Sequence, residues 1–268
     1  MGTIFFELAL TLYFAGFLLS MAGIFRKKDD FDKSVLVVSF SGFALHTLYL
    51  IIRYIKSSQA PVFSMHEATS FFTWSIMITS IWLWFSYKGK ILNFSVIIIF
   101  LFMFISAFFS RNIPLIKPEL KSIWIDMHAL MAVFGIALFS LAFVFSILYL
   151  IHEKAIKNKK FGGIGNILPS LEVLDKINYR LIFWGFPIYT IALLVGLVKY
   201  LNILGFLFDP KEIWSFLTWV VYLSIFYLRI KGDWRKKKAA YLTIFAFLLV
   251  IFGFFGINLL TESFHKPL

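Results

Sequence analysis

Cysteine is absent from the 268-residue chain. Its absence excludes disulfide bonds, thiolate metal sites and any C-x-x-C-H motif in this protein. Charged residues are also scarce, at 15%, whereas 60% of the residues are hydrophobic and 20% are aromatic. So few charges cannot cover the surface of a soluble globular protein of this composition. The composition therefore indicates an integral membrane protein.

Eight apolar segments approach or exceed the length of about 20 residues that a helix needs to span a bilayer. The first lacks a basic leading region and carries Glu7, so we interpret it as a span rather than a signal peptide. The sequence predicts an all-α integral membrane protein, a bundle of about eight transmembrane helices in one domain over residues 1–268. The predicted spans are Ile4–Phe25, Ser34–Ile55, Glu67–Tyr87, Ile91–Ser110, Ile125–Ile151, Leu181–Lys199, Ile213–Leu228 and Ala239–Leu260.

Acidic residues are outnumbered by basic ones, 14 to 26, which gives a net charge of +12. The loops after the first, third, fifth and seventh predicted spans hold 18 of the 26 basic residues, in "RKKDDFDK", "KGK", Lys154–Arg180 and "RIKGDWRKKK". Loops rich in Lys and Arg stay in the cytoplasm. We therefore attribute the positive charge to membrane orientation rather than nucleic-acid binding, and we expect both termini outside.

The stretch "FLFDPKEIWSFLTW" places charges at the predicted outer end of the seventh span. A charge at the centre of a bilayer costs roughly 3 kcal/mol, so these residues are expected at an edge or in a site. Asp209 fits the N-cap of a helix, Pro210 its first residue and Glu212 its third. This capping-box pattern predicts a helix start at Pro210.

Histidine occurs five times, and His66, His128 and His265 fall at predicted outer helix ends. His46 lies within the second predicted span, and His152 lies in a cytoplasmic loop. Each histidine alone is more often a hydrogen-bonded polar residue than a ligand. Two neutral imidazoles from distant parts of a chain can, however, hold one haem and leave its edge open.

Several segments resemble the cytochrome c assembly protein family, the CcsA/ResC type that includes HemX-type proteins. Its core is similar to Leu174–Ile230, "LDKINYRLIFWGFPIYTIALLVGLVKYLNILGFLFDPKEIWSFLTWVVYLSIFYLRI". "WIDMHALM" resembles the family's outer histidine at a helix start, and "GINLLTESFH" resembles its C-terminal histidine segment. "PVFSMHEATSFFTW" resembles a segment of the N-terminal half, so the resemblance covers most of the chain.

The resemblance implies a protein of the bacterial cytoplasmic membrane that binds haem b transiently and presents it outside to apocytochrome c. It implies a CcsB/ResB-type membrane partner, and a haem-handling component of a synthase complex rather than a stand-alone enzyme. His128 and His265 would be the axial ligands of the haem iron, and Lys211 a partner for a haem propionate. The cofactor-binding residues implied in all are His46, His66, His128, Phe206, Phe208, Asp209, Lys211, Trp214 and His265.

Some positions depart from the family pattern. Asn202, Phe206 and Phe208 stand where the family has three tryptophans, and Tyr227 stands where many members have an intramembrane histidine. These changes leave open a HemX-like role as a regulator or accessory of tetrapyrrole synthesis. A b-type electron carrier or a transporter is a further alternative, although His46 is the only histidine deep within a predicted span.

The predicted orientation can be tested with a reporter that is active only in the cytoplasm. Fused to the C-terminus, it should give no signal, whereas the same reporter in the loop after the fifth span should be active. A strong C-terminal signal would mean that one span has been miscounted, and His265 would then lie on the opposite side from His128.

Overall fold

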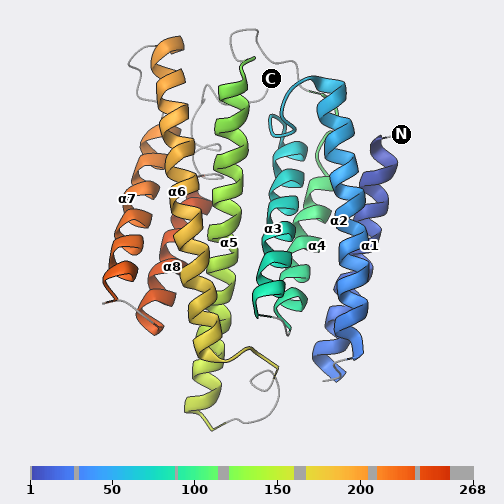
Figure 1. Cartoon of the computed structure of the whole chain (residues 1–268), viewed down its shortest axis with the longest axis vertical. Helices are drawn as coiled ribbons and strands as arrows, with labels where there is room; N and C mark the ends of the chain where they lie inside the picture. The colour runs from blue at the N-terminus through green and yellow to red at the C-terminus, as the bar shows by residue number, and fades with distance from the viewer. Residues whose placement is uncertain are drawn as a thin grey trace. The chain divides into compact units, whose positions relative to one another are not determined.

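The computed structural model describes residues 2–26, 30–87, 90–113, 121–159, 167–204, 210–232 and 236–253. These residues form eight α-helices and no strand (Figure 1). Each helix overlaps one of the eight predicted segments. The helices are α1 (Gly2–Arg26), α2 (Asp30–Ser57), α3 (Met65–Tyr87), α4 (Ile91–Ala107), α5 (Ile123–Lys157), α6 (Leu171–Leu204), α7 (Pro210–Lys231) and α8 (Lys237–Ile251).

Six of these helices, all but α4 and α8, are long and apolar enough to cross a membrane. α4 has 17 residues and α8 has 15 within the described part of the chain. The all-α, multi-pass membrane class is thus confirmed. The count of eight spans and the outward termini stay predictions.

The described helices divide between two compact units. Unit 1 comprises residues 1–113 and 155–170, and unit 2 comprises residues 114–154 and 171–268. Unit 1 therefore contains α1 to α4, and unit 2 contains nearly all of α5 together with α6 to α8. That the whole chain forms one domain stays a prediction.

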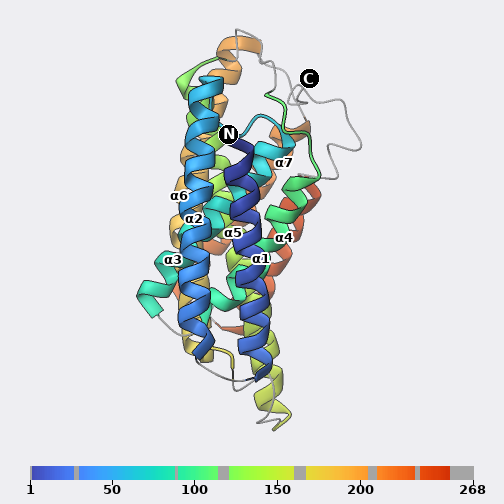
Figure 2. The same cartoon turned by 90° about the vertical axis from the view of Figure 1, so that its right-hand side faces the viewer.

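In unit 1, α1 packs along α2 and α4, and α3 packs along α4 (Figure 2). Small residues allow the close contacts. A Cβ on Gly42 would lie 3.1 Å from the ring of Tyr13, and one on Gly16 would lie 3.1 Å from Ser39. Small residues at helix contacts are typical of membrane bundles, where packing rather than the hydrophobic effect joins helices. The core of this unit contains the fully buried Phe6 and Tyr13.

In unit 2, α7 packs against α6 and α8. Its core contains Phe139 of α5 stacked on Tyr222 of α7, with ring centroids 3.6 Å apart and planes 11° apart. α6 begins ten residues before the predicted span, at Leu171. The charged stretch was excluded from the prediction, but several of its polar groups form hydrogen bonds within unit 2. Asp175 accepts a hydrogen bond from Arg229 at 2.7 Å, and the Asn178 amide donates to Ser146 at 2.8 Å.

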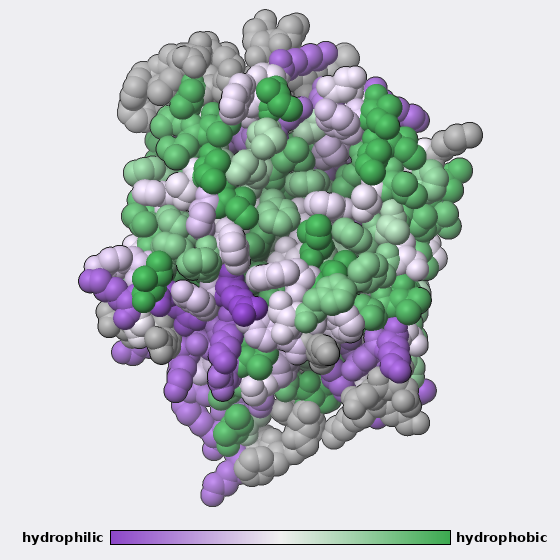
Figure 3. All heavy atoms as spheres, in the orientation of Figure 1, coloured by the Kyte–Doolittle hydropathy of each residue, from purple (hydrophilic) through white to green (hydrophobic). Residues whose placement is uncertain are grey.

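Large apolar side chains remain exposed along the helices. Phe25 is 80% exposed and Phe108 75%, and many Leu, Ile and Phe residues of the spans are about half exposed. Figure 3 shows hydrophobic residues over most of the visible face, with hydrophilic residues gathered mainly in its lower part. An apolar surface of this extent suits lipid tails rather than water.

Candidate functional site

His128 lies in the second turn of α5, at the end of unit 2 where α6 finishes and α7 starts. Its side chain is partly buried. Its Nδ1 atom lies 2.7 Å from the backbone carbonyl oxygen of Ala192 on α6. A carbonyl oxygen can only accept a hydrogen bond, so Nδ1 must carry the proton. In neutral imidazole, Nε2 then keeps its lone pair.

This arrangement suits a metal-ligating histidine. Ligating histidines generally donate their second ring N–H to a backbone carbonyl or a carboxylate, which fixes the tautomer and the ring orientation. Among the described residues, no hydrogen bond to Nε2 of His128 is formed. Nε2 therefore keeps a lone pair that can be donated to a metal ion without breaking a hydrogen bond among the described residues.

Trp214, near the start of α7, is at the same end of unit 2. Its indole Nε1–H donates to the carbonyl of Leu249 on α8 at 2.8 Å, and its ring lies 5.0 Å from that of Phe252. A Cβ on Gly253 would overlap the indole. The Trp214 ring thus joins the start of α7 to the end of α8, and its N–H is already used.

Several predicted site residues lie outside the described residues: Phe206, Phe208, Asp209 and His265. Lys211 belongs to α7, but its side chain is also outside the description. α7 begins at Pro210, the residue that the sequence predicted as the first of the helix.

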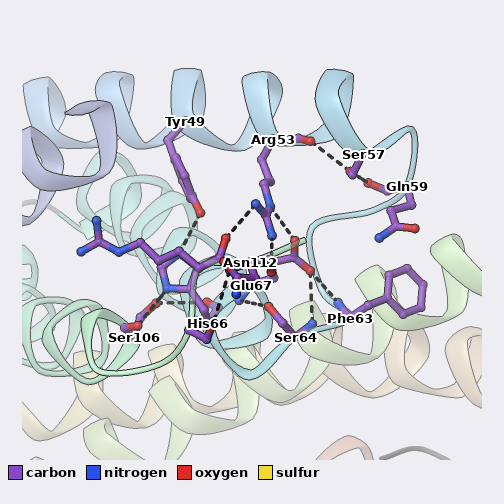
Figure 4. Close-up of polar contacts among 12 residues, drawn as sticks. Tyr49, Arg53, Ser57, Gln59, Phe63, Ser64, His66, Glu67, Ser106 and Asn112 are labelled. Atoms are coloured by element: carbon purple, nitrogen blue, oxygen red, sulfur yellow. Dashed lines mark hydrogen bonds and ion pairs between the residues drawn. The ribbon is translucent and has the colours of Figure 1, made fainter. Parts of the chain in front are cut away.

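His66 and His46 belong to unit 1, and both are fully buried. Nδ1 of His66 donates to the carbonyl of Ser106 at 2.8 Å, and its Nε2 accepts from the Tyr49 hydroxyl at 2.7 Å (Figure 4). His46 is hydrogen-bonded through Nε2 to Ser70 at 2.9 Å and through Nδ1 to Tyr13 at 3.5 Å. Both nitrogens of each ring are engaged, so binding iron at either histidine would first require one of these bonds to break.

A buried ion pair lies beside His66. The Nε atom of Arg53 on α2 donates to Oε1 of Glu67 on α3 at 2.6 Å, and the two side chains are only 10% and 1% exposed. The other guanidinium nitrogens donate to the carbonyls of Arg111 and Asn112 at 3.0 and 2.9 Å (Figure 4). The guanidinium thereby links the segment that follows α4 to the C-terminal end of α2 by hydrogen bonds.

Glu67 also caps its own helix. Its Oε2 accepts the backbone N–H groups of Phe63 and Ser64 at 3.2 Å, while Ser64 Oγ accepts the N–H of Glu67 at 3.1 Å. This is the reciprocal capping box, whose sequence signature is Ser/Thr-x-x-Glu. The signal "SMHE", residues 64–67, was present in the sequence but was not recognised there as a helix start. Its pairing with Arg53 could be found only from the packed helices.

Within the described residues, no group of three or more histidine and acidic side chains could hold a metal ion by itself. The six helices that are long and apolar enough to cross a membrane define a multi-pass membrane protein.

Comparison with known proteins defines the family. The sequence profile of the family described as Cytochrome C assembly protein matches residues 62–265. The chain belongs to this family, which confirms the resemblance found from the sequence. It is 29% identical to the cytochrome c biogenesis protein CcsA of Guillardia theta, over 82% of this chain and 80% of the relative. It is 27% identical to CcsA of Prochlorococcus marinus strain NATL2A, over 97% and 95%, and 31% identical to that of Chlamydomonas reinhardtii, over 83% and 65%.

The buried ion pair of unit 1 generates a prediction about stability. Glu67→Leu leaves the Arg53 guanidinium buried without its partner and removes the cap of α3, so it should cost about 3–5 kcal/mol. Glu67→Gln keeps an acceptor oxygen and should cost less. The thermal unfolding midpoint of the detergent-purified protein measures both.

The double variant Arg53→Met/Glu67→Leu is the control, because it removes both charges together. It should recover part of the loss seen in Glu67→Leu. Equal, small losses in all three variants would mean that the pair contributes nothing to the fold.

Proposed function

We propose that the protein binds haem and presents it for the assembly of c-type cytochromes, with His128 and His265 as the two axial ligands of one haem. The observation that carries the proposal is the hydrogen bond from Nδ1 of His128 to the Ala192 carbonyl, which leaves Nε2 available. The family match over residues 62–265 includes both histidines and therefore supports the same pair.

Haem is cargo in this proposal, and the chain contributes ligation and orientation. Two imidazoles fill both axial positions of the iron and leave the porphyrin edge open, as transfer to another polypeptide requires. The chain has no cysteine, so any thiol that becomes attached to the haem must come from the partner polypeptide. Phe206 and Phe208 offer flat apolar area for the porphyrin, and Lys211 a charge for a propionate.

The partners follow from this role. Relatives of this chain are named as cytochrome c biogenesis proteins, which supports apocytochrome c as the acceptor. We further propose a CcsB/ResB-type membrane partner, haem b as the bound form and a haem site on the outer face of the bacterial cytoplasmic membrane. The engaged histidines of unit 1 favour this role over that of a b-type electron carrier, which needs free histidine pairs within the bundle.

A HemX-like role in tetrapyrrole synthesis is the second candidate. It is favoured by Asn202, Phe206 and Phe208, which replace the three tryptophans of the assembly proteins. Phenylalanine keeps the apolar area of tryptophan but lacks the indole N–H. Restored c-type cytochrome content in a host strain without its own assembly protein would support the first role. Haem binding without such restoration would favour the second.

The axial-ligand pair can be tested with four matched substitutions in the full-length protein: His128→Gln, His265→Gln, His66→Gln and His46→Gln. The first two should each lower haem affinity by at least about tenfold and convert the six-coordinate visible spectrum to a five-coordinate one. Added imidazole should restore part of the six-coordinate spectrum by filling the empty position. The two unit 1 variants should keep the spectrum.

The pair assignment fails if His128→Gln and His265→Gln keep a full six-coordinate spectrum while His66→Gln or His46→Gln abolishes it. A protein that stays colourless after expression with ample haem would contradict the proposed function as a whole.

Two roles are proposed for the "DPKE" segment, residues 209–212: capping the start of α7 and binding a haem propionate. Substitutions can distinguish them. Lys211→Ala removes a charge-assisted hydrogen bond to a propionate and should weaken haem binding roughly tenfold without lowering the protein level. Asp209→Asn should leave both unchanged, because Asn also caps helices well. Unchanged haem binding in Lys211→Ala would reduce the segment to a capping box.

A further inference from the structure

Gly196 on α6 lies directly against the imidazole of His128. A Cβ built on Gly196 would lie 2.5 Å from both Cε1 and Nδ1 of the ring and 3.2 Å from Cγ. Real Cβ atoms do not approach other heavy atoms so closely. The ring therefore occupies the space that any side chain at position 196 would need.

The need for glycine here does not come from the helix itself. Gly196 lies inside the 34-residue α6, and glycine destabilises a helix interior relative to alanine. No left-handed backbone angle is found at this position; among the described glycines only Gly232 has a positive φ. Among the described residues, the close approach of the imidazole is the feature that requires the missing side chain.

The same turn of α6 supplies the hydrogen-bond acceptor. Ala192 is four residues before Gly196, so in a regular helix its carbonyl accepts the N–H of Gly196. A carbonyl oxygen has a second lone pair, and the Nδ1–H of His128 takes it at 2.7 Å. Ala192 and Gly196 thus form one seat, in which the carbonyl fixes the proton on Nδ1 and the bare Cα makes room for the ring.

We infer that Gly196 is a positioning residue for haem ligation: its missing side chain lets the His128 ring reach the Ala192 carbonyl, which holds the imidazole in the tautomer whose Nε2 keeps a lone pair for iron. The inference rests on the proposed function, in which His128 is an axial ligand. A hydrogen bond from Nδ1–H to a carbonyl also makes the imidazole a more basic ligand, which favours ferric over ferrous iron. The seat therefore affects both haem affinity and the reduction potential.

Gly185 provides a matched comparison on the same helix. A Cβ there would lie 2.9 Å from Cε1 of Phe139 and 3.2 Å from Cβ of Leu138, two apolar side chains of α5. Gly185 therefore serves helix packing and touches no candidate ligand. Alanine at Gly185 reports the general cost of adding a methyl group between α5 and α6.

The test compares Gly196→Ala with Gly185→Ala in the full-length protein, purified in detergent after expression with ample haem. Gly196→Ala should accumulate normally, because alanine suits the helix and the imidazole can turn aside. Its haem affinity should fall about 10- to 100-fold, the usual effect of losing a residue that orients a metal ligand. Its reduction potential should rise, and added imidazole should restore a six-coordinate spectrum. Gly185→Ala should leave the potential and the spectrum unchanged.

Two further variants distinguish failure of the Gly196 inference from failure of the proposed function. If Gly196→Ala matches the wild type in affinity, spectrum and potential while His128→Gln does not, the positioning role is overturned and the proposed function stands. If His128→Gln also matches the wild type, the proposed function fails. If Gly196→Ala fails to accumulate, the accumulation of the double variant His128→Ala/Gly196→Ala shows whether the clash with the His128 ring is the cause. Normal accumulation of this double variant supports the seat, because the ring is gone, whereas continued failure shows a packing role only.

Discussion

The hydrocarbon core of a membrane offers no water, so every polar group placed in a spanning helix must find its partner within the protein. The described residues of the two units meet most of this constraint in the same manner, although a few buried oxygens, such as those of Ser20, Ser39 and Tyr222, lack a hydrogen-bond partner there. Hydroxyl groups return to their own helix, as Thr79 and Ser80 do by donating to carbonyls four residues earlier. Buried charges are paired at helix ends, Arg53 with Glu67 in unit 1 and Asp175 with Arg229 in unit 2. The apolar surface is left for lipid.

The same constraint distinguishes the histidines. His46 and His66 are fully buried, and each has both ring nitrogens engaged by neighbours. They contribute to the packing of α2 and α3. His128 is only partly buried, and among the described residues only its Nδ1 forms a hydrogen bond, which leaves the Nε2 lone pair for a metal ion or a hydrogen-bond donor. Incomplete satisfaction of a polar group at the end of a bundle is thus the structural signature of the candidate site.

Hydropathy and helix-start chemistry were sufficient to predict the eight helices and the first residue of α7 at Pro210. The start of α6 was missed, because charged residues such as Asp175 and Arg180 indicated a loop. In the structure the helix includes them, and Asp175 is paired with Arg229 of α7. His128 was identified by resemblance, but its tautomer and its seat at Gly196 depend on how closely α6 approaches α5. No periodicity in one helix encodes that distance. The partner of Glu67 was missed for the same reason, since Arg53 belongs to another helix.

The carboxylate of Glu67 has a consequence for the motions of unit 1. It is bonded at once to the first turn of α3 and to α2, while Arg53 is bonded to the segment after α4. Helix ends ordinarily fray independently, with little free energy needed for local opening. Here no one of the three segments can open without breaking bonds to the others. Their backbone amides should therefore exchange with solvent deuterium together, as one cooperative unit.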